Sequence, residues 1–201
     1  MSIVLYWHPR SCATPIVSSL KELAVPHELV EIDIEAGEQR NPEFLALNPN
    51  GKVPTLTVNG APMFESLAIQ LWLGERYGVE RGLWPAADTP ERLQAMSWSA
   101  WIYVSYSAVV WRLYHSAHGV ASRRDAVQAK MALDDMHELL AVLDGHLAKR
   151  PWILGDGYSL ADLVVGAGIA YSAFMGAVAA HPHVQAWCDR VSARPSMQLL
   201  P

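Results

Sequence analysis

The first part of the chain alternates between the hydrophobic patterns of strands and of a helix. Residues 3–7 form a short apolar run that predicts a buried strand. From Ile16 to Ala24, apolar residues recur at spacings of three and four, which predicts a helix. Residues 27–34 alternate between apolar and charged side chains, as in a half-buried strand. This order predicts a βαβ unit whose two strands are parallel.

A hairpin and a further helix follow this unit. Asn59-Gly60 separates two short apolar runs, and this pair is preferred in two-residue hairpin turns because both positions need positive φ. A helical pattern then spans residues 66–77. Together with the βαβ unit, this order predicts a thioredoxin-like α/β domain over residues 1–78.

The rest of the chain has the periodicity of helices. Residues 79–88 contain glycine and proline without periodicity, which predicts a linker. Beyond it, a long helix is predicted from Thr89-Pro90 to about Ala117, and every later apolar pattern is helical. We therefore expect an all-α domain over residues 89–201.

Two capping boxes divide the predicted helical domain. Ser122 is followed by Asp125, and Ser159 is followed by Asp162, each at the spacing that starts a helix. Residues 163–180 carry no charge, so this stretch has the minimum length of a membrane span. A helix buried in a protein core is the better interpretation, because Asp162 opens the stretch and no basic flank follows it.

Composition narrows the classes of function. The 201 residues are 51% hydrophobic and 17% charged, with a net charge of −5 and no basic cluster, so neither nucleic acid nor a membrane is an expected partner. Cys12 and Cys188 make no disulfide framework, and no signal-peptide pattern begins the chain, so we expect a cytoplasmic location. His115 and His118 lack a carboxylate or cysteine at ligand spacing, so no metal site is predicted.

The segment from Pro9 to Cys12 lies where the first strand meets the first helix. A helix N-terminus carries unpaired N–H groups and partial positive charge, which stabilise a thiolate. The thiolate could belong to Cys12 or to a bound thiol that accepts a hydrogen bond from Ser11 or Cys12. The structural alternative stays open: Ser11 as a helix cap and Cys12 as a small buried apolar residue.

Two more segments have the features of a peptide-binding site. Val53 precedes Pro54 directly before a strand, and a cis peptide there would turn the backbone of Val53 outward to pair with an extended peptide. Ser66 follows Glu65 at the start of a helix, where a carboxylate could bind, with Glu65 holding an ammonium group beside it. An ordinary edge-strand loop and a simple N-cap by Ser66 are the alternatives.

Taken together, these segments resemble the cytosolic glutathione transferase family, its bacterial beta- and theta-like members among others. The resemblance covers nearly the whole chain. It runs through Leu5-Tyr6, Pro9-x-Ser11-Cys12, Asn48-Pro49-x-Gly51-Lys52-Val53-Pro54, Glu65-Ser66, Leu83-Trp84-Pro85, Ser159-Leu160-Ala161-Asp162 and Ala186-Trp187-x-x-Arg190.

The resemblance implies a homodimer that binds glutathione mainly on its first domain. It implies that Val53, next to Pro54, pairs with the cysteinyl backbone, and that Glu65 and Ser66 hold the γ-glutamyl end. Lys52 is expected to reach a carboxylate of the peptide.

The residue that stabilises the glutathione thiolate has three candidates. Cys12 is positioned like the cysteine of the beta-class enzymes, and Ser11 resembles the serines of the theta- and zeta-like groups. A gapless match to those groups, however, places Arg10 where their serine usually lies. Tyr6 resembles the strand-end tyrosine of the tyrosine-type classes, although Leu-Tyr in the first strand is common in the serine and cysteine types as a structural pair.

The second substrate is expected to be an apolar electrophile. The first long helix carries Tyr106, Val110 and Trp111, which would suit a flat apolar molecule, although such rings also pack in helical cores. The expected activity is glutathione conjugation. An isomerase, a dehalogenase or a thiol-disulfide reductase on the same fold, or a regulatory protein that binds glutathione without turnover, are the alternatives.

Overall fold

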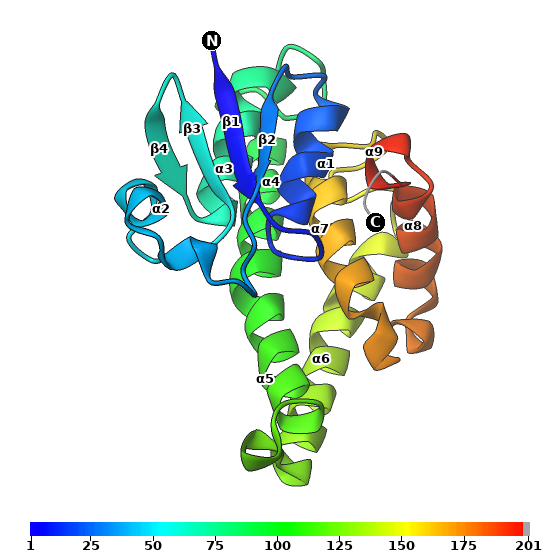
Figure 1. The fold of residues 1–201 in the computed structure, drawn as a ribbon. Coiled ribbons are helices and arrows are strands. Elements are labelled where there is room, and N and C mark those ends of the chain that lie inside the picture. The colour runs from blue at the N-terminus through cyan, green and yellow to red at the C-terminus, as the bar shows by residue number, and fades with distance from the viewer. Residues whose placement is uncertain (199–201) are drawn as a thin grey trace. The chain divides into compact units, whose positions relative to one another are not determined.

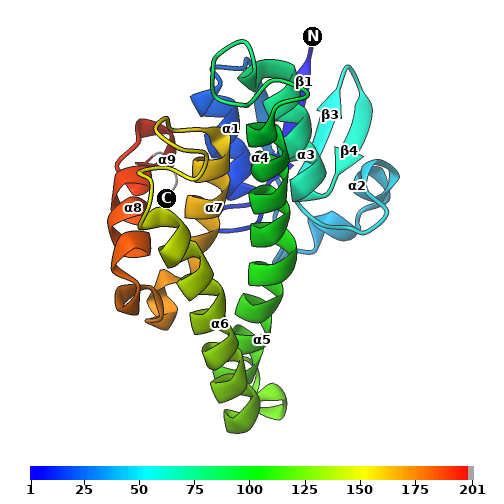
Figure 2. The same cartoon turned by 180° about the vertical axis from the view of Figure 1, so that it is seen from behind.

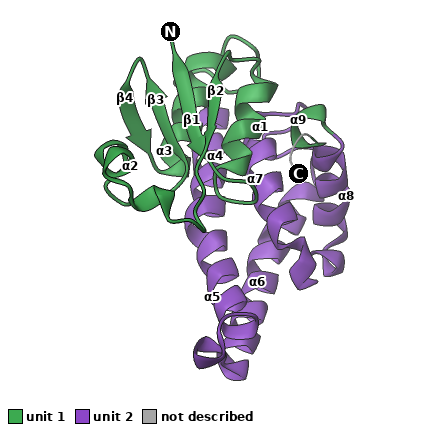
Figure 3. Ribbon diagram, in the orientation of Figure 1, with its two compact units in different colours: residues 1–89, 194–201 green, residues 90–193 purple. Residues whose placement is uncertain are grey.

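The computed structural model describes residues 1–198, which divide into two compact units (Figure 3). The first unit contains Met1–Thr89 and the C-terminal segment from Arg194 onward. The second unit contains Pro90–Ala193 and is entirely helical in its regular structure. The predicted fold class, a thioredoxin-like α/β domain followed by an all-helical domain, is confirmed.

A four-stranded sheet in the order β2-β1-β3-β4 forms the centre of the first unit (Figure 1). β1 pairs in parallel with β2 and antiparallel with β3, so the predicted βαβ unit is confirmed. Leu5 and Leu56 lie opposite each other in this sheet and are both fully buried. The elements of this unit are β1 (Ile3–Trp7), α1 (Thr14–Glu22), β2 (Glu28–Glu31), η1 (Glu38–Arg40), α2 (Pro42–Leu47), β3 (Thr55–Val58), β4 (Ala61–Phe64), α3 (Ser66–Leu73), η2 (Gly74–Gly78) and α9 (Pro195–Gln198).

The hairpin between β3 and β4 has the predicted turn. Asn59 and Gly60 both take positive φ, at 51° and 84°. The side-chain oxygen of Asn59 also accepts a hydrogen bond from the backbone N–H of Ser2 at 2.9 Å. The turn therefore fixes the register of two strands and holds the start of the chain beside them.

A buried polar contact joins α1 to α3. The hydroxyl of Ser19 lies 2.8 Å from the side-chain oxygen of Gln70, and both residues are fully buried. Buried polar groups are costly without a partner, so this pair favours one relative placement of the two helices. Cys12 lies just before α1 and Ser66 begins α3, so the same contact helps to hold two parts of the candidate site together.

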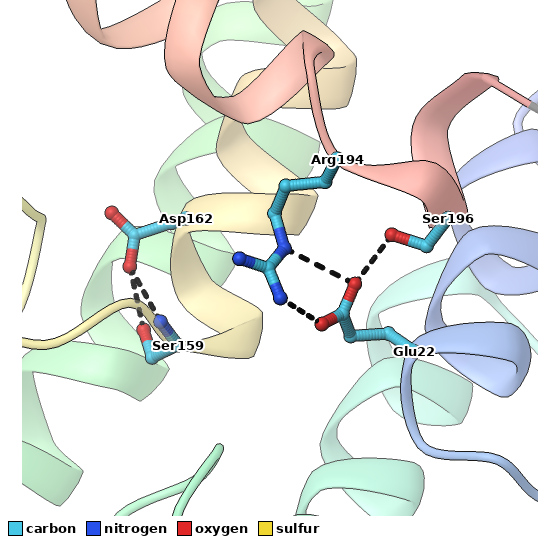
Figure 4. A network of polar contacts seen from close by, with 5 residues as sticks. All are labelled: Glu22, Ser159, Asp162, Arg194 and Ser196. Atoms are coloured by element: carbon cyan, nitrogen blue, oxygen red, sulfur yellow. Dashed lines mark hydrogen bonds and ion pairs between the residues drawn. The ribbon is translucent and has the colours of Figure 1, made fainter.

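The C-terminal segment packs on the first unit through Glu22, the last residue of α1 (Figure 4). Arg194 makes two hydrogen bonds to the Glu22 carboxylate, and Ser196 donates a third. We had expected the helical domain to extend to the end of the chain. The structure instead groups the segment from Arg194 with the first unit, because these contacts and those between α9 and α1 hold it there.

Glu22 gives this contact a defined pH dependence. Burial alone would raise the pKa of Glu22, but the hydrogen bonds from Arg194 and Ser196 outweigh burial and lower it. A lowered folded-state pKa means that the stabilisation is complete above the unfolded-state pKa of about 4.3. The stabilisation is then lost as the pH falls through the folded-state value.

We therefore expect Glu22→Gln to lower the free energy of unfolding at pH 7 and to differ less from the wild type as the solution is acidified below pH 4. Denaturant titrations at both pH values measure this difference. Glu28→Gln, on the exposed face of β2, is the matched control and should change little at either pH. A difference between Glu22→Gln and the wild type that stays constant with pH would contradict the ionic role of Glu22.

The second unit begins with a long helix that contains an irregular stretch. The predicted helix from Thr89-Pro90 to Ala117 is continuous, but its centre, η3, is a π-helix. π-Helical stretches are short insertions into α-helices. The elements of this unit are α4 (Pro90–Ala100), η3 (Trp101–Tyr106), α5 (Ser107–Ala117), η4 (Ala121–Arg123), α6 (Ala126–Leu147), α7 (Leu160–Ser172), η5 (Ala173–Met175), η6 (Val178–Ala180) and α8 (Pro182–Ser192).

The first of the two predicted capping boxes is wrong in its details. Ser122 lies inside the short helix η4 and does not cap α6. Asp125 is the N-cap, and its carboxylate accepts hydrogen bonds from the backbone N–H groups of Val127 and Gln128 at 2.9 and 3.0 Å. The pattern identified the right region because Asp125 is itself a strong cap.

The second predicted capping box is confirmed and is fully buried (Figure 4). The carboxylate of Asp162 accepts hydrogen bonds from the N–H and hydroxyl of Ser159 at 2.9 and 2.8 Å. It also accepts from the backbone N–H of Ile153 at 2.8 Å and from the indole of Trp187 at 3.0 Å. Asp162 thus joins α7, the loop before it and α8 into one core.

The uncharged stretch after Asp162 is a buried core helix only as far as Ser172, so the prediction of one buried helix over residues 163–180 is confirmed for its first half; most of residues 173–180 are exposed and form short 3-10 helices and turns. Ten of the thirteen residues of α7 are buried. Within residues 1–198, none of the helices has both the length and the apolar character that a bilayer span requires.

Candidate functional site

Three segments of the first unit meet around Cys12. The hydroxyl of Ser66, at the start of α3, donates a hydrogen bond to the backbone carbonyl of Cys12 at 3.3 Å. The charges of Glu65 and Lys52 both act on the Cys12 thiol, the first raising and the second lowering its pKa. The turn before α1, the turn before α3 and the loop before β3 therefore lie near one another around Cys12.

The Cys12 thiol is not predisposed to ionise. Burial raises the pKa of Cys12 above its usual value, although part of the residue is exposed, and the Glu65 carboxylate adds to the rise. A hydrogen bond to its own backbone and the Lys52 ammonium oppose this effect without reversing it. The direction is opposite to the expectation from a helix N-terminus, because Cys12 lies in a turn two residues before α1 and is partly desolvated.

Ser11 uses its hydroxyl within the same turn. The hydroxyl donates to the carbonyl of His8 at 2.6 Å and accepts from the N–H of Ala13 at 3.1 Å. Ala13, not Ser11, is the N-cap of α1. Both hydrogen-bonding roles of Ser11 therefore shape the turn that carries Cys12.

Tyr6 lies in the second half of β1. Its ring is half-buried and meets Phe44 of α2 edge to face, with 6.0 Å between ring centres. Packing therefore accounts for part of the Leu5-Tyr6 pattern. Tyr6 contacts Phe44, and Leu5 lies in the core on the opposite face of the strand.

Glu65 has a backbone conformation that the sequence pattern did not predict. It is the N-cap of α3, with φ at 71° and ψ at 117°. Such a conformation costs a residue other than glycine about 1–3 kcal/mol and is common at functional sites. Ser66 is consequently the first residue of the helix, so the alternative in which Ser66 is a simple N-cap is wrong, and its hydroxyl donates to the Cys12 carbonyl.

The side chain of Asn48 holds the loop before β3, a role that the sequence patterns did not predict. Its side-chain amide donates to the carbonyl of Lys52 at 2.8 Å and to the Thr55 hydroxyl at 3.1 Å, and its oxygen accepts from the N–H of Asn50 at 3.0 Å. Asn48 is only 2% exposed. An asparagine directly before a Pro-x-Gly turn is the sequence signal that could have identified this role, because asparagine side chains often hydrogen bond to the backbone of a following turn.

The same loop presents the backbone of Val53. The peptide bond between Val53 and Pro54 is cis, as the sequence suggested. Among the described residues, none hydrogen bonds to the backbone N–H or C=O of Val53. These groups are thus available to an extended peptide.

We expect Asn48→Ala to raise the KM for glutathione about 2- to 10-fold while kcat changes little, because the variant loosens the loop that carries Lys52 and Val53 without touching the thiol. Steady-state kinetics measure the two constants separately. Asn41→Ala is the matched control, since Asn41 is exposed and its side chain caps nothing. An Asn48→Ala variant with unchanged KM would show that this loop is not a binding element.

The three residues predicted to contact a second substrate do not form one surface. Tyr106 is 1% exposed, and its hydroxyl lies 2.7 Å from that of Ser172, while Val110 is 8% exposed. The expectation that Tyr106 and Val110 face a ligand is therefore corrected, because both pack in the interior. Trp111 is 51% exposed and accessible.

Comparisons with known proteins identify the family. The family model described as glutathione S-transferase, N-terminal domain, matches residues 1–75, and the one for the C-terminal domain matches residues 102–195. The chain belongs to the glutathione transferase family. This agrees with the resemblance that the sequence motifs showed.

Individual relatives of this glutathione transferase family member differ in their described activities. The chain is 31% identical to glutathione S-transferase 3 of Zea mays over 91% of its own length and 85% of the maize protein. It is 28% identical to the disulfide-bond oxidoreductase YfcG of Escherichia coli, over 96% of its length and 92% of that protein. A glutathione transferase from Burkholderia graminis, solved with two glutathione molecules per subunit, superposes with a TM-score of 0.86 at 27% identity, covering 98% and 86% of the two chains.

Proposed function

We propose that this protein binds glutathione on its first unit and uses the glutathione thiolate as a nucleophile toward an apolar electrophile. The observation that carries this proposal is the convergence of Lys52, Glu65 and Ser66 on the turn that bears the Cys12 thiol. A tripeptide with an α-amino acid at one end and a thiol in its middle residue offers a partner for each of these groups.

Each part of glutathione has a complementary group in this site. The Glu65 carboxylate would pair with the ammonium of the γ-glutamyl residue. The backbone N–H groups at the start of α3 would take its carboxylate, together with the Ser66 hydroxyl once this turns from the Cys12 carbonyl to the ligand. The free N–H and C=O of Val53 would pair with the cysteinyl residue as an added strand does. Lys52 would reach a remaining carboxylate as a point charge.

The chemistry requires that the bound thiol lose its proton before it attacks. The sulfur then forms a bond to an electrophilic carbon, and either a leaving group departs with its electron pair or the product takes up a proton. Because the pKa of Cys12 is raised, its thiol stays protonated at neutral pH and suits a hydrogen-bond donor to the glutathione thiolate better than a nucleophile. Tyr6 and Ser11 are the other candidates for this donor, and Ser11 would have to exchange its hydrogen bond to the His8 carbonyl for one to the thiolate.

The pH dependence of single-turnover rates with glutathione bound tests the assignment. We expect Cys12→Ala to shift the pH dependence of the rate to higher pH by about one unit, since a lost hydrogen bond to the thiolate raises the pKa of the glutathione thiol. Cys12→Ser keeps a donor and should stay close to the wild type. Glutathione affinity should change little in both variants.

Two outcomes would contradict the role of Cys12 as a donor. One is a wild-type pH profile for Cys12→Ala beside an altered one for Ser11→Ala or Tyr6→Phe. The other is a covalent glutathione adduct on wild-type protein, seen by intact-mass measurement without reductant and absent from Cys12→Ala, which would make Cys12 a nucleophile.

A second candidate function is disulfide reduction by glutathione. It is favoured by the similarity to YfcG and by the relative that was solved with two glutathione molecules per subunit. The first thiolate would attack a substrate disulfide and release one thiolate, and a second glutathione would release the other and leave as oxidised glutathione. Turnover of a small disulfide with glutathione but not of an aryl halide would favour this candidate, and binding without either activity would favour a regulatory role.

A further inference from the structure

The turn that carries Cys12 leaves the sheet at a proline. β1 and β2 are parallel, with Trp7 opposite Glu31, and the N–H of Ile32 donates to the carbonyl of Trp7 at 2.8 Å. A parallel ladder continued by one step would take the N–H of residue 9 to the carbonyl of Ile32. Residue 9 is Pro9, which has no N–H, so the backbone ladder cannot continue to that carbonyl.

The side chain of His8 replaces the missing N–H. Its Nδ1 lies 3.0 Å from the carbonyl oxygen of Ile32. A carbonyl can only accept, so Nδ1 carries the proton and Nε2 is the bare nitrogen of the neutral ring. Ile32 is only 7% exposed, and a buried carbonyl without a partner is costly. His8 therefore joins the end of β1 to the end of β2 where proline cannot.

The backbone of His8 also holds the turn itself. Its carbonyl accepts a hydrogen bond from the Ser11 hydroxyl at 2.6 Å, and that hydroxyl accepts one from the N–H of Ala13 at 3.1 Å. Inside the turn, Arg10 has a left-handed conformation with φ at 53°, which is unfavourable for a residue with a Cβ atom. A strained turn keeps its shape only when the surrounding structure fixes it. His8 fixes one end of this turn, and α1 begins at the other.

The position of this turn determines the surroundings of the Cys12 thiol. α1 lies with α3 on one face of the sheet, and the Ser66 hydroxyl of α3 reaches the Cys12 carbonyl (Figures 1 and 2). The charges of Glu65 and Lys52 act on the thiol from the neighbouring segments. A shift at the His8 end of the turn would therefore move Cys12 relative to both charges.

We propose that His8 is a positioning residue of the candidate site, because its Nδ1–H bond to the Ile32 carbonyl fixes the start of the turn that places Ser11 and Cys12. His8 acts through the turn, so it needs no contact with the substrate. The effect on turnover rests on the proposed function, whereas the effect on the Cys12 thiol does not.

Three substitutions of His8 distinguish the two ring nitrogens. In His8→Asn, the side-chain amide nitrogen occupies nearly the position of Nδ1 and can donate to the Ile32 carbonyl. In His8→Gln, the amide nitrogen reaches nearly the position of Nε2 instead, and His8→Leu has neither nitrogen. His27→Leu is the matched control, since His27 makes the same kind of bond from Nδ1 to the Val25 carbonyl at 2.7 Å, but before β2 begins.

The first measurement is the rate at which iodoacetamide alkylates Cys12 in the full chain without glutathione, followed by intact mass. Cys188 is buried, so one adduct is expected. We expect His8→Leu and His8→Gln to react about three- to tenfold faster than the wild type, because a loosened turn relieves the burial that raises the pKa of Cys12. His8→Asn and His27→Leu should react like the wild type.

The second measurement is the single-turnover rate with glutathione bound, as a function of pH. His8→Leu and His8→Gln should slow the bound complex about tenfold, because the donor to the thiolate loses its place, while glutathione affinity changes less than about twofold. His8→Asn should restore the wild-type rate. A residue that only stabilises the fold would lower the melting temperature without separating rate from affinity.

Three results would overturn the proposal. One is equal behaviour of His8→Asn and His8→Gln, and this comparison decides even if His8→Leu does not fold. Another is a wild-type alkylation rate in His8→Leu, and the third is equally fast alkylation in His27→Leu, which would show a general loosening of the first unit. A wild-type protein that neither binds nor uses glutathione would contradict the proposed function alone, and the alkylation rates would still decide the role of His8.

Discussion

Asp162→Ala is expected to lower the melting temperature by about 6–12 °C while leaving the activity of each folded molecule close to that of the wild type. The substitution removes the acceptor for buried hydrogen-bond donors of three residues, Ile153, Ser159 and Trp187. Leaving buried donors unsatisfied costs about 1–3 kcal/mol each, so the total should be about 3 kcal/mol or more. A chain of this length loses roughly 2–4 °C per kcal/mol.

Asp125→Ala is the matched control for Asp162→Ala. Asp125 also caps a helix of the same unit, through two N–H groups of α6, but it is exposed. Losing a surface N-cap costs about 1 kcal/mol, so its melting temperature should fall by only about 2–4 °C. Equal losses in the two variants would contradict the importance of burial. Normal melting of Asp162→Ala together with lost catalysis would show that Asp162 acts in the reaction.

The parts of the fold that the sequence predicted are those with a strong local cause. The Asn59-Gly60 turn needs positive φ at two neighbouring positions, and few residue pairs permit that. Ser159 and Asp162 form a reciprocal box that a four-residue pattern contains completely. In both cases the interaction and the pattern involve the same residues, so no distant contact could change the result.

The features that the sequence missed depend on contacts far along the chain. Nothing local to Arg194 shows that it pairs with Glu22, which lies at the other end of the chain. The raised pKa of Cys12 likewise depends on burial and on Glu65, which only the folded chain brings near. The prediction that Tyr106 faces a ligand was wrong for the same reason, since its buried partner Ser172 comes from another helix.

The proposed glutathione site lies between these two cases. Short sequence motifs pointed to Lys52, Val53, Glu65 and Ser66 as candidate site residues. In the structure, Lys52, Glu65 and Ser66 each interact with Cys12. The sequence did not predict the positive φ of Glu65 or the contact between the Ser66 hydroxyl and the Cys12 carbonyl, because both depend on how α3 packs. Their assignment as ligand-binding residues is a prediction that binding measurements can decide.

Glu65→Gln and Ser66→Ala are each expected to weaken glutathione binding about 10- to 150-fold, because each removes a charge-assisted hydrogen bond worth roughly 1.5–3 kcal/mol. Glutamine keeps the shape of Glu65, so the strained backbone is not relieved. Calorimetric titration measures both affinities. Glu28→Gln makes the same change in net charge on β2 and should bind glutathione like the wild type.

Two glutathione analogues separate the roles of Glu65 and Ser66 from a general disturbance of the site. Glutaryl-cysteinyl-glycine lacks the ammonium that Glu65 would hold, so Glu65→Gln should bind it as well as the wild type does. γ-Aminobutyryl-cysteinyl-glycine lacks the carboxylate that Ser66 would hold, so Ser66→Ala should lose little affinity for it. Each variant should still be impaired toward the analogue that keeps its own partner. If Ser66→Ala weakened both analogues equally, its effect would come from the lost contact with the Cys12 carbonyl, and unchanged glutathione affinity in both variants would remove the γ-glutamyl site altogether.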